Sequence, residues 1–550
     1  MADLRRSQDK RHHLVLSSPW SVVGITALAA ALRLINLSGR PIWYDEAFAV
    51  LYAEKPLSTM LYGTLTQFQG AAADVHPLFF YAVLHAWMGM VGQSPPAVRA
   101  LSVLLGTATV MMVYLLARRL FGWRSGLAAA TIVAVAPFPI YYAQEARMYA
   151  LLGFAAITTT YFFVCAWAGG RWGNWIAFSV FGAITLYAHN LGFAFLAGMD
   201  LWVLWAWFRP QGARGRNLRP VLLSHVLMLG LFAPWLLVVP SQIGKIQQAY
   251  WVQQPGIAQL IQTLIVFHFA YDNQSLPGWV LPPALLLSLL IPAIMVFERA
   301  RQRRSSNHRS PSPTPCSLFT APFSLLLFLT LTPILLTFLV SQIHPVYIVR
   351  ALLPSALTYY VLVASVLVVG SVPRPVKWGL LVPAVVIVAA SLWNHYSYTQ
   401  FPRSPFDQVA TYLRAHRQAG DSIVHSNKLT FFPTHYYDRS LQQAFIADEP
   451  GSPSDTLAYP TQEALGLYAT PDLATATRGH DRVWFVIFGR AVDEYRQAGQ
   501  PDHPHRMWLE RHYNLMSVTS FNDLDLYEYQ TGPTPAAEAP LAFHPLDAGR

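Results

Sequence analysis

Residues 98–124 read VRALSVLLGTATVMMVYLLARRLFGWR, a long apolar run that ends among arginines. Its apolar part, from about Val98 to Ala117, has the length of roughly 20 residues that an α-helix needs to cross a membrane. Arg118, Arg119 and Arg124 follow at once, and basic residues beside a span mark the cytoplasmic side. This stretch predicts a transmembrane helix whose C-terminal end faces the cytoplasm.

The composition of the whole chain agrees with a membrane protein. Of its 550 residues, 54% are hydrophobic and only 12% are charged, and the mean hydropathy is +0.33. These values are typical of a multi-span helical protein. The net charge of +10 lies mostly in short clusters between apolar runs, which indicates topology rather than nucleic-acid binding. Cys165 and Cys316 give neither a metal-binding spacing nor a disulfide framework.

About eleven crossings follow when the same rule is applied outward from residues 98–124. The first runs from about Trp20 to Leu37 after the basic segment MADLRRSQDKRHH, and we expect it to stay uncleaved with a cytoplasmic N-terminus. The others are predicted at about residues 98–117, 126–142, 150–168, 176–208 (two helices joined at AHNLG), 221–239, 281–297, 319–340, 351–369 and 378–393.

Two further apolar stretches, residues 77–92 and 257–271, are predicted not to cross. The basic clusters at residues 118–124, 209–219 and 299–309 all fall on the cytoplasmic side only if these two stretches remain outside. We therefore expect both to be interfacial helices on the outer leaflet.

The C-terminal part differs sharply in composition from the rest. FDQVATYLRAHRQAG predicts an amphipathic helix stopped by Gly420, and DSIVHS and RVWFVIFG predict buried strands. GSPSDTLAYPTQ and TGPTPAAEAP are typical of loops. The predicted fold class is an all-α polytopic membrane protein with a small C-terminal α/β domain. Its predicted parts are a cytoplasmic N-terminus (1–18), a transmembrane domain (19–397), an extracytoplasmic α/β domain (398–535) and a flexible tail (536–550).

Four predicted outer-face segments carry ionisable side chains. They are SGRPIWYDEAF, DVHP, QEARMY and IHPVYIVR. Carboxylates near arginines at a membrane surface suit a base for an acceptor hydroxyl beside cations that hold a phosphate leaving group. In chain order these side chains are Asp45, Glu46, Asp74, His76, Glu145, Arg147, His344 and Arg350.

Structural interpretations of the same residues remain open. A carboxylate at the end of a span is often only a solvated flank, and Trp43 and Tyr44 are also typical interfacial anchors. Arg147 and Arg350 could extend their side chains to the interface. Asp200 lies near the middle of a predicted span, where it is either functional or part of a hydrogen bond between packed helices.

The order of motifs resembles a known superfamily. A first outer loop with WYDEA, then DVHP, SPPAVRALSVLLG, a basic inner loop and YYAQEARMYAL is similar to the protein O-mannosyltransferase and aminoarabinose transferase superfamily of C-type glycosyltransferases, over about residues 20–240 and more loosely through YIVRALLP to about 400. The resemblance implies a polyprenyl-phosphate sugar donor. It assigns the catalytic carboxylate to Asp45, with Glu46 in support, and functional importance to Arg99.

The expected activity is inverting transfer of a hexosyl or pentosyl group to a hydroxyl on the outer face of the cell (inner) membrane. The acceptor class stays open between lipid, glycan and protein, because this chain has HPLFFY after the His-Pro pair and lacks a central trefoil domain. The predicted site residues are Asp45, Glu46 and Glu145 (catalytic) and His76, Arg99, Arg147, Tyr149, His344 and Arg350 (substrate-binding).

No obligatory cofactor is expected, although Asp45, His76 and Glu145 could meet around Mg²⁺ or Mn²⁺.

Two other functions would explain part of the pattern. A lipid or solute transporter with an acidic outer vestibule would normally carry its ionisable groups near the midplane, where only Asp200 stands out. A sensing scaffold would explain the C-terminal domain and leave the acidic pair without a role.

Overall fold

The computed structural model describes residues 19–169, 171–208, 218–248, 251–271, 277–306, 316–370 and 372–531. The predicted N-terminal segment and flexible tail lie outside these residues, as do residues 209–217 and 307–309 of the two later basic clusters. The contacts divide the chain into two compact units. We call Met1–Ile35, Arg99–Trp235 and Gln253–Tyr396 the helical unit, and Asn36–Val98, Leu236–Val252 and Ser397–Arg550 the sheet unit.

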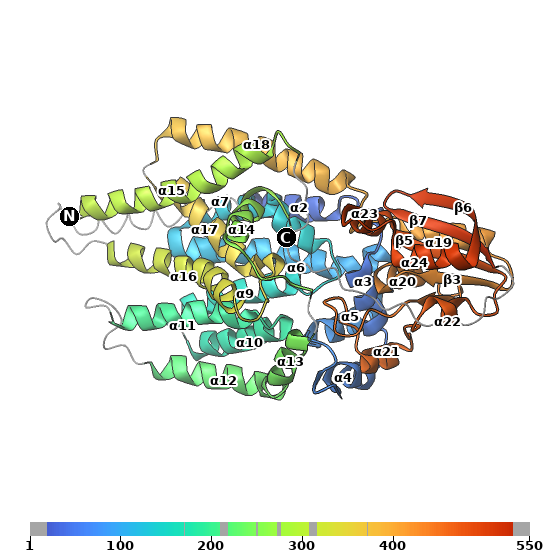
Figure 1. Ribbon diagram of the computed structural model, residues 1–550. Helices are drawn as coiled ribbons and strands as arrows, with labels where there is room; N and C mark the ends of the chain where they lie inside the picture. Colours follow the sequence, from blue (N-terminus) through green and yellow to red (C-terminus); the bar gives the residue numbers. More distant parts are fainter. Residues whose placement is uncertain are drawn as a thin grey trace, which may run out of the picture. The chain divides into compact units, whose positions relative to one another are not determined.

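Helices form all the regular structure described in the helical unit (Figure 1). Among the described residues, seven helices are long and apolar enough to cross a membrane, or eight if the bent pair α7 and α8 counts as one span. The helices are α2 (Pro19–Leu34), α6 (Pro95–Phe121), α7 (Trp123–Val135), α8 (Pro137–Ala143), α9 (Tyr149–Trp167), α10 (Trp172–Ala188), α11 (Gly192–Phe208), α12 (Arg219–Leu236), α14 (Ile257–Phe269), α15 (Leu281–Ser306), α16 (Cys316–Val340), the 3-10 turn η1 (Val349–Leu352), α17 (Leu353–Val369) and α18 (Arg374–Ser397).

The prediction of about eleven spans is confirmed in part. Each predicted span coincides with a helix, but α2, α10 and α11 have only 16 or 17 residues. At 1.5 Å per residue such a helix is about 25 Å long, shorter than the hydrocarbon core. The two stretches predicted not to cross form α5 (Phe79–Val91) and α14, each of 13 residues. Their interfacial position stays a prediction.

The bend between α7 and α8 has an identifiable cause. Pro137 begins α8, and the axes of the two helices differ by 61°. A proline lacks the N–H that would continue the backbone hydrogen bonds of the helix. The fully buried Arg33 of α2 donates to the carbonyl oxygens of Val133 at 3.1 Å and Ala134 at 3.2 Å, at the end of α7. A positive charge at a helix C-terminus also suits the helix dipole.

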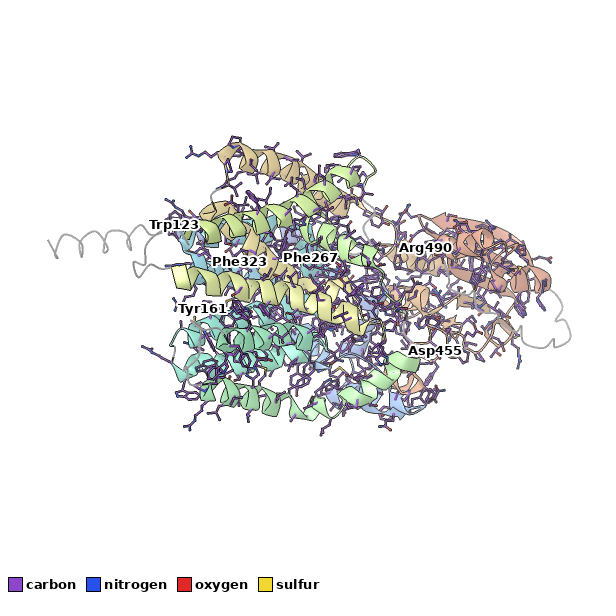
Figure 2. The ribbon with its side chains drawn as sticks, turned by 60° about the vertical axis from the view of Figure 1, so that its left-hand side comes forward. Trp123, Tyr161, Phe267, Phe323, Asp455 and Arg490 are labelled. Carbon is purple, nitrogen blue, oxygen red and sulfur yellow. The ribbon has the colours of Figure 1, made fainter. Side chains whose placement is uncertain are left out.

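Small residues and polar pairs join the helices. Gly198 of α11 approaches α16 so closely that an added Cβ would lie 3.0 Å from the Phe328 carbonyl oxygen. Asp200 of α11 accepts a hydrogen bond at 2.8 Å from His225 on α12, which is the helix-packing alternative considered for this residue. Aromatic rings also pack between the helices. The Phe267 ring of α14, labelled in Figure 2, lies 5.8 Å from the Phe138 ring of α8 and 6.4 Å from the Tyr359 ring of α17, between ring centres.

A five-stranded mixed sheet is the core of the sheet unit. The order is β4-β3-β5-β7-β6, in which β3 is parallel to β4 and β5 and the other pairs are antiparallel. Alternate side chains of β5 enter two apolar clusters, with Val483 and Phe485 in one and Trp484 and Val486 in the other, as the two-residue period of a strand requires. The strands are β3 (Asp421–His425), β4 (Gln443–Phe445), β5 (Arg482–Phe488), β6 (Tyr513–Phe521) and β7 (Leu524–Thr531).

Short helices surround this sheet. The predicted strands coincide with β3 and β5, and the predicted amphipathic helix ends at His416, four residues before Gly420. The segment GSPSDTLAYPTQ was predicted as a loop, but its last residues begin α21, where Pro460 has the fixed backbone angle that suits a first turn. The helices are α3 (Tyr44–Ala53), α4 (Leu57–Leu65), α5, α13 (Val239–Gln248), α19 (Phe406–His416), α20 (Lys428–Tyr437), α21 (Tyr459–Leu465), α22 (Leu473–Thr477), α23 (Gly489–Gln497) and α24 (Pro504–His512).

The sheet unit is discontinuous in sequence. It includes the first outer segment, residues 36–98, with the two-stranded β1 (Gln67–Phe68) and β2 (Ala71–Ala72). It also includes residues 236–252 and the C-terminal part. The segment that carries the acidic pair thus packs within the same unit as the C-terminal sheet. The predicted domain boundaries stay a prediction.

Candidate functional site

The acidic pair lies on the first turn of α3. Asp45 and Glu46 follow Tyr44, the first residue of the helix, where the helix dipole favours negative side chains. Every residue from Glu46 to Ala53 is buried, and Glu46 has no exposed surface. Asp45 is partly exposed. Of the two carboxylates, Asp45 is therefore the one that an acceptor could reach.

The DVHP segment forms a compact polar turn. The Asp74 Oδ1 atom accepts a hydrogen bond at 3.0 Å from the backbone N–H of His76 and lies 2.9 Å from the His76 Nδ1 atom. A carboxylate on one ring nitrogen fixes the orientation of an imidazole. The His76 ring, with about a quarter of its surface exposed, is thus held by its own turn.

Helix α13 adds two polar residues that the sequence analysis missed. Gln242 donates through Nε2 to the Asp74 carbonyl oxygen at 3.2 Å. Three residues later, the buried Lys245 donates to the Asp455 carbonyl oxygen at 3.4 Å. Burial lowers the pKa of Lys245, although Asp455 and Asp74 act in the opposite direction. The i, i+3 spacing in QIGKIQQ was the available signal, because it puts both side chains on one helix face.

Four predicted residues of the helical unit lie in the link before α9, at the start of α9 and on η1. Glu145 and Arg147 lie in the link between α8 and α9, and Tyr149 begins α9. The Arg350 guanidinium, on η1, lies 5.4 Å from the centre of the Tyr149 ring. Tyr149 also lies 6.1 Å, between ring centres, from His189, another residue that the sequence analysis missed. Both arginines, Glu145 and Tyr149 are buried.

Charged groups buried in a membrane-spanning unit are costly unless they interact with other groups, and they commonly mark a functional site. A guanidinium over an aromatic face gains a cation–π attraction while its N–H groups stay directed to the sides. The Arg350 guanidinium over the Tyr149 ring is such an arrangement, and it fixes part of the orientation of this cation.

Two predicted residues lie apart from these groups in sequence. Arg99 is fully buried in the first turns of α6. His344 is partly exposed and lies in the turn after α16, where its N–H donates to the Val340 carbonyl oxygen at 2.9 Å. Across the described part of the chain, no three His, Cys, Asp or Glu side chains gather as they would around one metal ion.

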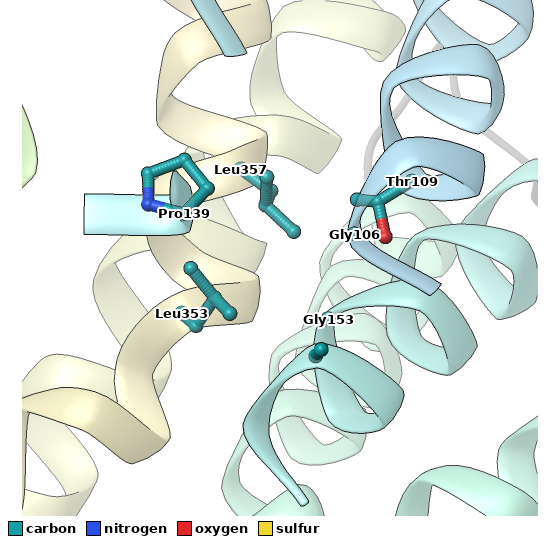
Figure 3. A pocket seen from close by; sticks show the side chains of 7 residues that line it. Gly106, Thr109, Pro139, Gly153, Leu353 and Leu357 are labelled. Atoms are coloured by element: carbon teal, nitrogen blue, oxygen red, sulfur yellow. The ribbon is translucent and has the colours of Figure 1, made fainter. Parts of the chain in front are cut away.

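An apolar pocket lies within the helical unit between α6, α8, α9 and α17 (Figure 3). Gly106 and Gly153 line it, together with Leu353 and Leu357. The two glycines cannot be enlarged freely, since an added Cβ would lie 2.5 Å from Ala143 at Gly106 and 3.2 Å from Leu353 at Gly153. Its lining residues do not include the predicted site residues.

Comparison with known proteins agrees with this architecture. Residues 75–238 match the family described as dolichyl-phosphate-mannose-protein mannosyltransferase, a range that includes His76, Arg99, Glu145, Arg147 and Tyr149. The matched range covers less than half of the chain and includes neither Asp45 nor the C-terminal sheet. No curated protein matches the chain.

Solved structures show the same fold at low sequence identity. ArnT from Cupriavidus metallidurans bound to undecaprenyl phosphate is 14% identical and superposes with a TM-score of 0.60, covering 93% of this chain and 98% of that one. Its apo state gives the same identity and coverage, with a TM-score of 0.61. Archaeal oligosaccharyltransferase AglB from Archaeoglobus fulgidus, in complex with an inhibitory peptide and a dolichol-phosphate, is 12% identical, with 94% and 75% coverage and a TM-score of 0.52.

Proposed function

We propose that this protein transfers a sugar from a polyprenyl-phosphate donor to a hydroxyl acceptor at the outer face of the cell membrane. The observation that carries the proposal is the partly exposed Asp45 at the start of α3, in a chain whose residues 75–238 match a mannosyltransferase family. The undecaprenyl phosphate bound by ArnT and the dolichol-phosphate bound by AglB support a polyprenyl-phosphate donor. The sugar, hexose or pentose, and the acceptor, lipid, glycan or protein, are left open.

In the proposed reaction, Asp45 accepts the proton of the acceptor hydroxyl as its oxygen forms a bond to the anomeric carbon. The bond between that carbon and the phosphate oxygen breaks, and the electron pair leaves with the polyprenyl phosphate. A single displacement of this kind inverts the configuration at the anomeric carbon. A base placed within hydrogen-bond distance of the acceptor typically contributes 10²- to 10⁴-fold to such a step.

The departing phosphate gains negative charge and needs fixed cations. We assign this role to Arg350, Arg147 and Arg99, because a guanidinium stays protonated and can bind two phosphate oxygens at once. Arg350 is held over Tyr149 at 5.4 Å, so part of its orientation is set before the ligand binds. Such pre-set charges stabilise a transition state without reorganisation.

The remaining site residues have supporting roles in the proposal. Glu46 and Glu145 are buried acids that would shape the field around the reacting groups. His76, oriented by Asp74 at 2.9 Å, and His344 would donate hydrogen bonds to the sugar or the acceptor. The C-terminal sheet and the reacting residues are proposed to face the extracytoplasmic side.

Replacing Asp45 with asparagine tests the assignment. Asparagine keeps the shape of the side chain and cannot accept the proton, so we expect turnover with a radiolabelled polyprenyl-phosphate sugar to fall by roughly 10²-fold or more. The matched control is Asp407→Asn, an exposed acid in the first turn of α19, which should keep full turnover. A folded Asp45→Asn enzyme with near-normal turnover would refute the role of Asp45.

The same assay separates the enzyme from a transporter. Release of polyprenyl phosphate together with sugar on a second molecule is expected only of a transferase. Movement of an unchanged donor across the membrane, with no new glycoside, would select the transporter instead.

We also propose that turnover needs no divalent cation, because the arginines can supply the positive charge that the leaving phosphate requires. Exhaustive chelation should leave the rate of sugar transfer unchanged. A loss of activity that Mg²⁺ or Mn²⁺ restores would contradict this part of the proposal.

A further inference from the structure

Helix α20 follows directly from the sheet and is rich in aromatic residues. Its residues 428–437 read KLTFFPTHYY, and the Asn427 side chain caps the helix by accepting from the N–H of Leu429 at 3.0 Å. Phe431 and Phe432 both pack on Phe445 of β4, at 4.6 and 5.9 Å between ring centres. The helix is therefore fixed to the sheet along one side.

Helix α20 also contacts α3, the helix whose first turn carries the acidic pair. Figure 1 shows the two helices beside each other. Phe432 meets the Tyr44 ring edge-on at 5.6 Å and lies 6.0 Å from the Phe48 ring. Tyr44 precedes Asp45, and Phe48 lies about one helical turn beyond it. The ring of Phe432 thus packs against the turn of α3 that carries Asp45.

Two polar contacts hold the ends of α3. The backbone N–H of Ile42, just before the helix, donates to the Tyr437 hydroxyl oxygen at 2.7 Å. At the other end, Arg439 donates from Nη1 to Glu54 Oε2 at 3.0 Å and from Nη2 to Glu54 Oε1. Glu54 is the C-terminal cap residue of α3, so one short segment of the sheet unit contacts the beginning, the first turns and the end of this helix.

We propose that α20, together with the nearby Arg439, positions Asp45. The positioning residues are Phe432, Tyr437 and Arg439. The inference rests on the proposed function and deepens it, since it gives the C-terminal sheet a role in the transfer reaction. A reacting group that is misplaced by about 1 Å can lose on the order of 10²-fold in rate. Holding α3 at both ends keeps the Asp45 carboxylate in one place.

The test uses full-length protein in detergent and two readouts. Tyr437→Phe removes the acceptor for the Ile42 N–H and keeps the ring, so kcat should fall roughly tenfold, the size of one lost hydrogen bond, while KM for the donor stays within about twofold because donor contacts are unchanged. Hydrogen exchange of residues 42–53 should become faster, and exchange of β5 should stay at the wild-type rate.

A charge swap provides the rescue. Arg439→Glu and Glu54→Arg should each lower kcat several-fold, and the double variant, with the pair reversed, should recover at least half of the wild-type kcat. The matched control is Arg496→Glu, which breaks the ion pair with Asp502, 3.0 Å apart, elsewhere in the sheet unit. This control should not change kcat.

The outcomes separate the two proposals. If the wild-type protein transfers sugar and Tyr437→Phe loosens α3 without lowering kcat, or the swap fails to restore kcat, the positioning role is wrong and the proposed function stands. If the wild-type protein transfers no sugar from any polyprenyl-phosphate donor, the proposed function is wrong and the positioning role with it.

Discussion

At the scale of single residues, burial separates side chains that look alike in the sequence. Asp45 and Glu46 are adjacent carboxylates, yet only Asp45 retains exposed surface. Arg33 lies within the predicted first span, and in the structure it is fully buried and donates to the carbonyl oxygens at the end of α7. Neighbouring sequence does not reveal such differences, because they depend on partners about a hundred residues away.

His425 gives a prediction at the same scale. It is fully buried on β3, with Nε2 2.8 Å from Gln443 Oε1. Burial lowers its pKa to about 3, although the hydrogen bond to Gln443 acts in the opposite direction. The unfolded chain takes up a proton at this histidine below pH about 6.5 and the folded chain does not, so stability should fall as the pH drops from about 6.5 toward 3, by at most about 1.4 kcal/mol per pH unit.

This loss of folding stability can be measured in full-length protein that lacks Cys165 and Cys316. A cysteine replaces the buried Val424, and the urea concentration at which this cysteine becomes reactive reports the stability at each pH. His425→Gln should flatten the dependence on pH between 6.5 and 4.5. The matched control is His416→Gln, at an exposed position on α19, which should leave the dependence unchanged. An identical slope in wild type and His425→Gln would contradict the prediction.

At the scale of elements, hydrophobic pattern was sufficient for the long helices and the central strands. Val98 to Ala117 lies within α6, and RVWFVIFG contains β5, because a long apolar run and a short β-branched and aromatic run each favour one kind of structure. The pattern gave no signal for α3 as a helix separate from the first span. It also gave none for α13, which is rich in polar residues.

The candidate site was predictable where a motif is local. Asp74 and His76 contact each other across two residues, and the DVHP motif indicated them directly. Tyr149 and Arg350 are 201 positions apart along the chain and meet only in the folded protein. Both were predicted as substrate-binding residues, but their contact depends on how η1 packs beside α9, which no local pattern contains.

At the scale of the whole molecule, the prediction concerns topology. The proposed site requires the C-terminal sheet to face outward and the links before α10 and α18 to face the cytoplasm. Single cysteines at Ala474, Gly173 and Pro373, all exposed, in a background without Cys165 and Cys316, report the three positions. In intact cells an impermeant thiol reagent should label only the first, and after permeabilisation it should label all three.

Labelling of Gly173 and Pro373 in intact cells, with Ala474 protected, would mean that α5 crosses the membrane. Every later segment would then have the opposite orientation, and Asp45 would no longer share a face with Glu145. That result would contradict the site as a whole, whereas labelling of Pro373 alone would place the error between α10 and α18.

The discontinuity of the sheet unit has a consequence for biogenesis. Residues 36–98 leave the ribosome early, and the segment that supplies α20 is among the last to be translated. Until then Tyr44, Phe48 and the Ile42 N–H have no partners from α20. A nascent or prematurely terminated chain can therefore insert its first helices while α3 remains unsupported, so full activity is delayed until synthesis is complete.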